Sequence, residues 1–225
     1  MGQYYKAVNI DRREYLSPHS FNCGARLMES CYVGNDFVNA LTTLLTGLWH
    51  ADRVMYIGDY AWNEVMNGRG SCSGACVLQG LKVTKEITAD PYSTSYSWHD
   101  AAEDSIALRP VRTVICGWDV ISRYTKLVGS EAREGNPNCS EMRYVVNEDL
   151  GVYYDRVALS SRDDCDLTLD PLLLFLAVGN GLGGGDYRSA EGQAPVGSWA
   201  CNVISASNER PEGLMEIANP FDPNA

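Results

Sequence analysis

The residues with the clearest chemical potential form a glycine-rich segment at positions 179–187, with the sequence GNGLGGGDY. Glycine loses more conformational freedom on folding than any other residue, so a folded loop of this composition needs positive φ angles or a ligand that approaches its backbone closely. Consecutive backbone amides followed by one carboxylate and one aromatic ring suit a small polar molecule. We therefore predict a ligand site made of Asn180, Gly181, Gly183, Gly184, Gly185, Asp186 and Tyr187.

Two other interpretations of this segment stay open. Its glycines at 179, 181 and 184 match the dinucleotide pattern GxGxxG, but Gly and Pro occur in residues 186–195, where that pattern requires a helix. No phosphate-loop lysine follows either, so the context argues against a nucleotide site. The loop is otherwise a nest of backbone amides that binds an anion, or a structural connection that covers the core.

A Gly-Asp-Tyr triplet occurs twice, at residues 58–60 and 185–187. If the regions that carry them face each other, Asp59 and Asp186 approach, and paired carboxylates can divide acid and base roles or hold a divalent cation. The plain alternative is that both triplets are turns. His19, which follows the first predicted hairpin, is the candidate general base.

The eight cysteines show no repeated short spacing, and the closest pair, Cys72 and Cys76, has neither the zinc nor the redox spacing. The three histidines do not lie at a ligand spacing either. The sequence therefore predicts no metal and no cofactor. In a chain without an export signal, the cysteines are predicted to be reduced thiols, partly in the core.

Composition limits the partners. The chain has 225 residues, of which 45% are hydrophobic, so it can bury a core, and its net charge of -11 is not clustered. Nucleic acids and anionic membranes are held by clustered Lys and Arg, so neither is expected. The longest apolar run, residues 171–178, is too short to span a bilayer, and the first residues lack the apolar part of a signal peptide. We predict a cytoplasmic protein.

The pattern of apolar residues predicts the elements that must position these groups. Residues 4–16 alternate and form a hairpin whose turn lies near Asp11 and Arg12. Helical spacing predicts a helix over residues 36–48 with Asn35 as its N-cap, and a strand follows at residues 53–57. A second hairpin is predicted at residues 142–154.

The two hairpins belong to an internal repeat. The sequence VNID at residues 8–11, with Tyr15, recurs as VNED at 146–149, with Tyr153, an offset of 138 positions. A leucine-rich segment, Gly-x-Trp and a strand follow in both copies, with Trp49 and Trp199 offset by 150 positions. Chance similarity is the alternative, but the order predicts two pseudo-equivalent halves. We expect an α+β fold, mainly antiparallel sheet with few helices, divided into residues 1–61, an irregular middle segment with strands at 62–138, and residues 139–225. The alternative is that the three ranges fold as one domain.

Four segments, residues 1–9, 53–61, 179–187 and 196–200, resemble an uncharacterised family of bacterial and phage proteins. The resemblance covers both ends of the chain but not residues 62–138, and it implies no activity because none is assigned to the family. We expect a soluble intracellular binding protein, phage-encoded, that captures a small polar ligand or a host protein. The alternatives are a hydrolase or transferase that uses the aspartate pair and a structural or assembly protein.

Overall fold

The computed structural model describes residues 3–12, 14–58, 95–96, 110–111, 126–127, 142–159, 167–178 and 196–221. The helices of these residues are the 3₁₀ helices η1 (Pro18–Phe21) and η3 (Arg156–Ala158) and the α-helices α1 (Leu27–Ser30), α2 (Asp36–Thr46) and α7 (Leu172–Leu176). The strands are β1 (Tyr5–Asn9), β2 (Glu14–Leu16), β3 (Asp52–Gly58), β4 (Ser95–Tyr96), β5 (Pro110–Val111), β6 (Lys126–Leu127), β7 (Tyr144–Asn147), β8 (Val152–Asp155), β9 (Ala177–Val178), β10 (Asn202–Ser207) and β11 (Met215–Glu216).

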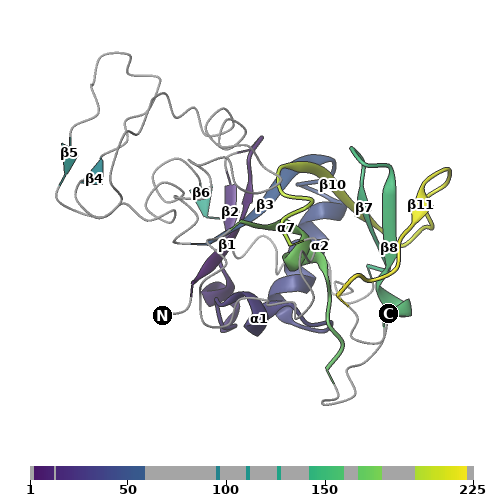
Figure 1. Ribbon diagram of the computed structural model, residues 1–225, viewed down its shortest axis with the longest axis horizontal. Coiled ribbons are helices and arrows are strands. Elements are labelled where there is room, and N and C mark those ends of the chain that lie inside the picture. The colour runs from purple at the N-terminus through teal and green to yellow at the C-terminus, as the bar shows by residue number, and fades with distance from the viewer. Residues whose placement is uncertain are drawn as a thin grey trace.

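One nine-stranded sheet dominates the structure, with the order β11-β8-β7-β10-β3-β1-β2-β6 and with β9 paired to β3 (Figure 1). The pairs are antiparallel except for β11 with β8, β6 with β2 and β9 with β3. The strands β4 and β5 form a separate antiparallel pair. The predicted fold class, α+β with mainly antiparallel strands and few helices, is confirmed.

Local chemistry explains where helix α2 begins and ends. The Asn35 side chain accepts hydrogen bonds from the backbone amides of Phe37 and Val38, which otherwise have no partner in the helix, as expected of an N-cap. At the other end, the amide of Gly47 donates to the Leu44 carbonyl, and the helix stops two residues before the predicted end. The predicted N-cap is confirmed.

The core lies on one face of the sheet, where helices α1, α2 and α7 cover strands of both halves. Aromatic rings fill it: Tyr56 stacks on Tyr5 with ring centroids 5.0 Å apart, and Phe175 stacks on Trp199 at 4.3 Å. Burying such rings removes a large apolar area from water. The other described members of this core include Ala7, Leu16, Leu27, Phe37, Leu41, Leu45, Trp49, Val145, Tyr154, Leu172, Leu176 and Ile204.

The strand pairing follows the internal repeat residue by residue. Val8 in β1 lies opposite Tyr15 of β2 and Met55 of β3, and Val146 in β7 has the same place between β8 and β10. The hairpins are related by an offset of 138 positions and the strands β3 and β10 by 150, the two offsets that the sequence shows. The halves therefore have equivalent strand pairing.

A pseudo-twofold axis relates the halves, because β3 and β10 pair with each other in a self-consistent way. Arg53 lies opposite Val203, which is the residue 150 positions later. The flanking pairs exchange under the same relation: Asn202 with Val54, and Ile204 with Asp52. Units related by twofold symmetry join through isologous contacts of this kind, in which the same segment of each unit pairs with its counterpart. The described strands of both halves thus form one continuous sheet.

The equivalence extends to the sheet edges. Strand β6 pairs parallel to β2 at Glu14 and Tyr15, and β11 pairs parallel to β8 at the equivalent Val152 and Tyr153. Both edge strands follow the third strand of their half in the chain. Of the predicted middle segment, residues 62–138, the structure describes β4, β5 and β6, and β6 belongs to the sheet of the first half. The division into three ranges stays a prediction.

Polar side chains of the two VNxD motifs hold the hairpins in the same way. The Oδ1 atoms of Asn9 and Asn147 accept the amides of Arg12 and Leu150, at 2.9 and 3.0 Å. The carboxylates of Asp11 and Asp149 accept the backbone amides at the start of β3 and β10, Arg53 and Val203, at 2.7 and 2.9 Å. These side chains cap turns and strand starts, and this structural role explains why the motif occurs twice.

Candidate functional site

The site predicted at the glycine-rich loop lies outside the described residues. Positions 179–195 are among the undescribed ones, and so is Asp59, so neither the ligand site at Asn180–Tyr187 nor the aspartate pair is tested. His19 is described: it lies exposed in η1, where its carbonyl accepts the Asn22 amide at 3.3 Å. Its role as a general base stays a prediction.

The glycine of the first Gly-Asp-Tyr triplet has a packing reason. A Cβ atom added at Gly58 would lie 2.5 Å from Gln3 Oε1 and 3.2 Å from the Tyr5 ring, and both of these neighbours are themselves buried. Any larger residue at this position therefore requires the core to shift. This observation favours the structural interpretation of that glycine.

The prediction of reduced cysteines is wrong for Cys201, which is disulfide-bonded. Cys23 and Cys31 are not in disulfides. Disulfides persist mainly in oxidising compartments, so Cys201 removes the support that reduced thiols gave to a cytoplasmic location. The mass of the intact protein should accordingly rise by at least two hydrogens on reduction, whereas the sequence predicted no difference. Among the described residues, no helix has the length and apolar character needed to cross a membrane.

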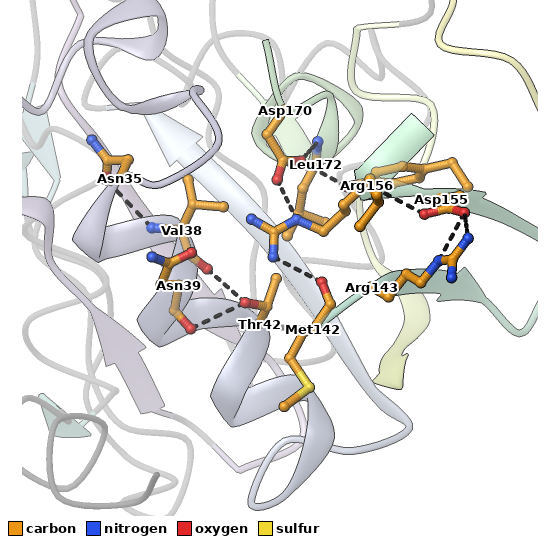
Figure 2. A network of polar contacts seen from close by, with 12 residues as sticks. Asn35, Val38, Asn39, Thr42, Met142, Arg143, Asp155, Arg156, Asp170 and Leu172 are labelled. Atoms are coloured by element: carbon orange, nitrogen blue, oxygen red, sulfur yellow. Dashed lines mark hydrogen bonds and ion pairs between the residues drawn. The ribbon is translucent and has the colours of Figure 1, made fainter. Parts of the chain in front are cut away.

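A buried ion pair beneath the second half is the strongest polar cluster of the described residues (Figure 2). Arg156 Nε lies 2.6 Å from Asp170 Oδ2, and the two side chains are only 4% and 0% exposed. The Tyr154 hydroxyl donates to Asp170 Oδ1 at 2.7 Å, and the Leu172 amide donates to the same oxygen at 3.1 Å. Arg156 Nη1 donates to the Met142 carbonyl at 3.0 Å. We call these groups the Arg156 cluster.

Local sequence places each member of the Arg156 cluster. Tyr154 lies in strand β8 with its ring in the core, and Arg156 is the first residue of the 3₁₀ helix η3, which follows β8 directly. Asp170 precedes α7 and accepts an amide of its first turn, as an acid does at a helix start. The exposed Arg143 donates a hydrogen bond of 2.7 Å to Asp155, the residue before Arg156.

The charges of the cluster shift the ionisation of its members. Burial raises the pKa of Tyr154 well above its usual value, and the Asp170 carboxylate adds to the increase. Burial by itself lowers the pKa of Arg156, but the attraction and hydrogen bond to Asp170 and the interaction with Tyr154 together outweigh this effect, so the pKa lies above its usual value. Arg156 therefore stays a cation and Tyr154 stays a neutral hydrogen-bond donor at physiological pH.

Two buried atoms, one in this cluster and one on helix α2, lack hydrogen-bond partners among the described residues. Arg156 Nη2 donates no hydrogen bond, and Asn39 Oδ1 on helix α2 accepts none. Figure 2 shows the guanidinium of Arg156 directed from η3 toward helix α2, the helix that carries Asn39. Buried polar groups are normally hydrogen-bonded, so this donor and this acceptor each leave one hydrogen bond unmade among the described residues.

The first half has a different polar cluster at the same depth. The Tyr56 hydroxyl is fully buried and makes no well-formed hydrogen bond to the described residues. Burial raises its pKa well above the usual value; the nearby Ser30 hydroxyl lowers it, and the thiols of Cys31 and Cys23 raise it further. Ser30 gives its own proton to the Gly24 carbonyl.

Sequence reasoning missed both clusters. The available signals were a cation directly after an apolar strand, at Arg156, and an acid before a leucine run, at Asp170. Neither indicates its partner. Within the described parts of the chain, no group of three or more His, Cys, Asp or Glu could hold a metal ion.

Comparison of the chain with protein-family models, curated proteins and solved structures gives no match in any of the three. The resemblance to a bacterial and phage family therefore stays a prediction, and the proposals below are supported by the geometry of this chain alone.

Proposed function

We propose that the protein binds a small polar ligand beneath its second half, with Arg156 as the central contact. The observation that carries this proposal is the unpaired Nη2 atom of a guanidinium whose side chain is 4% exposed. An unpaired donor on a buried cation costs several kcal/mol, on the order of 1–3 or more, unless another group accepts its hydrogen bond.

The chemistry of the site limits the ligand. Asp170 already balances the charge of Arg156, so the ligand need not be an anion. It should present an acceptor to Arg156 Nη2 and a donor to Asn39 Oδ1, as a primary amide or a hydroxyl group does. An ordered water molecule has the same two capacities and is the alternative occupant.

The proposal is tested first by native mass spectrometry of the protein purified from its own host lysate. We expect an adduct of small mass that survives desalting. Purified candidates with amide or hydroxyl groups should then raise the melting temperature in proportion to the logarithm of their concentration, because they bind only the folded state.

Substitutions on helix α2 test whether the ligand binds at this site. Asn39→Ala should weaken ligand retention about tenfold, because each net hydrogen bond contributes about 1 kcal/mol and an unpaired ligand donor costs more. Thr43→Ala, one turn further along the same helix and also half-buried, is the matched control and should bind normally. A wild-type protein that retains no adduct, together with a crystallographic water between Arg156 and Asn39, would contradict the proposal.

A further inference from the structure

The last described residues of the chain, 217–221, form a strap on the second half. The strap begins at the sheet edge, where the Ile217 amide donates to the Tyr153 carbonyl of β8 at 2.8 Å. From β11 the chain runs back toward helix α7 (Figure 1), and Phe221 ends the strap with its side chain only 3% exposed. The residues between these two points, 218–220, are exposed or half-buried. The strap is therefore attached mainly at its two ends.

The Phe221 ring packs directly on helix α7. Its centroid lies 5.3 Å from that of Phe175, in an edge-on arrangement. Phe175 in turn stacks on Trp199 at 4.3 Å and lies 6.2 Å from the Tyr154 ring. Aromatic pairs at these separations attract each other in addition to the apolar area that they bury. The strap is thus anchored on the same aromatic group that surrounds Tyr154.

This aromatic group leads to the Arg156 cluster. Tyr154, whose ring contacts Phe175, donates its hydroxyl to Asp170 at 2.7 Å. Asp170 lies two residues before helix α7, which carries Phe175. A continuous series of contacts through these two rings therefore joins Phe221 to Asp170. Chains of packed side chains that have two discrete arrangements can couple the positions at their two ends.

A ligand reaches this cluster only if a covering segment moves, because the side chains of Arg156 and Asp170 are 4% and 0% exposed. Strands and helices beside the cluster are poor candidates, since β8 and α7 are buried along their whole length. The strap differs from them: its middle faces solvent, and a largely exposed loop, residues 208–213, connects β10 to β11. Segments with few buried groups open locally at a lower free energy than the core.

We propose that the strap is a gate for the Arg156 cluster. When it is docked, Phe221 holds the rings of Phe175 and Tyr154 in place and closes the site. When it is released, the contact between Tyr154 and Asp170 loosens and a ligand enters. The gate rests on the proposed function of this site, whose ligand it would retain. A gate speeds or slows entry and release together, so it sets how long the ligand stays bound.

Hydrogen exchange of the full-length protein, followed residue by residue by NMR, tests the gate without any ligand. The reporter is the Leu172 amide, which donates to Asp170 inside the cluster, and the reference is the amide of the buried Met55 in β3. Phe221→Ala should raise the exchange rate of Leu172 relative to that of Met55 about tenfold or more, because the site then opens locally rather than by global unfolding. Phe221→Leu keeps an apolar anchor and should stay near the wild-type ratio.

The matched control is Phe21→Ala. This phenylalanine is likewise buried and packs edge-on, against Phe37 of the first half. Its replacement should lower the stability of the whole protein and therefore leave the ratio of the two exchange rates unchanged. The gate is overturned if Phe221→Ala shows the same ratio as the wild type or as this control.

A second measurement separates the gate from the proposed ligand. If the protein purified from its host carries an adduct, Phe221→Ala should lose it about tenfold faster on buffer exchange, and Phe21→Ala should keep it. An adduct that Phe221→Ala retains as long as the wild type overturns the gate and leaves the binding site in place. A wild-type protein without an adduct contradicts the proposed ligand instead, while the exchange ratio still shows whether the strap controls the cluster.

Discussion

The two halves of the molecule share their backbone arrangement but differ in the polar groups beneath it. In the second half, the buried Tyr154 hydroxyl is bonded to Asp170, which is paired with Arg156. In the first half, the buried Tyr56 hydroxyl makes no such bond, and burial together with the thiols of Cys31 and Cys23 raises its pKa. The positions equivalent to Tyr154 and Arg156 in the first half are the apolar Leu16 and Pro18.

This difference separates structural residues from candidates for function. Side chains that recur with the same hydrogen bonds, such as Asn9 and Asn147, hold turns in both halves. Side chains that occur in one half only are not needed to form the common arrangement, because the other half forms it without them. The Arg156 cluster and the buried Tyr56 hydroxyl are both of this second kind.

The largest effect on stability should come from Arg156→Met. This change leaves the Asp170 carboxylate fully buried without its cation, and breaking a buried pair costs about 3–5 kcal/mol. Urea denaturation measures the loss. Arg143→Met is the control: this arginine is half-exposed where it pairs with Asp155, so its removal should cost clearly less than breaking the buried pair. Equal losses in the two variants would show that the buried Arg156–Asp170 pair contributes no more to the free energy of unfolding than the pair of Arg143 with Asp155.

The two tyrosines should respond in opposite ways to loss of the hydroxyl. Tyr154→Phe removes a hydrogen bond to a carboxylate and should cost about 1.5–3 kcal/mol. Tyr56→Phe removes a buried hydroxyl that lacks a partner, which itself costs about 1–3 kcal/mol, so stability should be unchanged or higher. Urea midpoints of both variants check the contrast. A clear loss in Tyr56→Phe would show that this hydroxyl has a partner in solution and would weaken the comparison.

The features that the sequence predicted correctly depend on local chemistry. Asn35 marks the start of helix α2, and the VNxD motifs mark two hairpin turns, because Asn and Asp bond the backbone a few residues away. These signals were sufficient for both hairpins, for α2 and β3, and for the repeat that relates the halves.

The features that it missed depend on contacts between distant segments. The pairing of Arg156 with Asp170 is set by how η3 packs against α7, which periodicity does not show. The edge strands β6 and β11 have two residues each, too few for an alternating pattern. Cysteine spacing does not give connectivity, so the disulfide of Cys201 was not predicted.

A smaller loss of stability is expected from replacing the two turn asparagines, Asn9 and Asn147. Asn9→Ala and Asn147→Ala should each cost about 1–2 kcal/mol, because each side chain is fully buried and accepts a turn amide. Asn9 should cost more, since its Nδ2 donates to the charged Asp52 at 2.9 Å, while Asn147 donates to the neutral Asn202 at 3.3 Å. Paired denaturation curves measure the difference. A loss in Asn147→Ala that equals or exceeds the loss in Asn9→Ala would contradict the predicted order.

The smallest predicted effect is a dependence of stability on pH at Asp155, a residue of the second half. Hydrogen bonds from Arg143 lower the pKa of Asp155 below its usual 3.8; burial opposes this effect, and the Val157 amide adds to it. A carboxyl whose pKa is lower in the folded state stabilises the fold fully above its unfolded pKa and loses this contribution as the pH falls through its folded pKa. The equivalent residue of the first half, Ser17, does not titrate in this range. Asp155→Asn should therefore be less stable than the wild type at about pH 6, and the difference should shrink as the pH falls below about 4. Denaturation curves across this range measure it, and a difference that stays constant down to about pH 2 would show that Asp155 gains nothing from its charge.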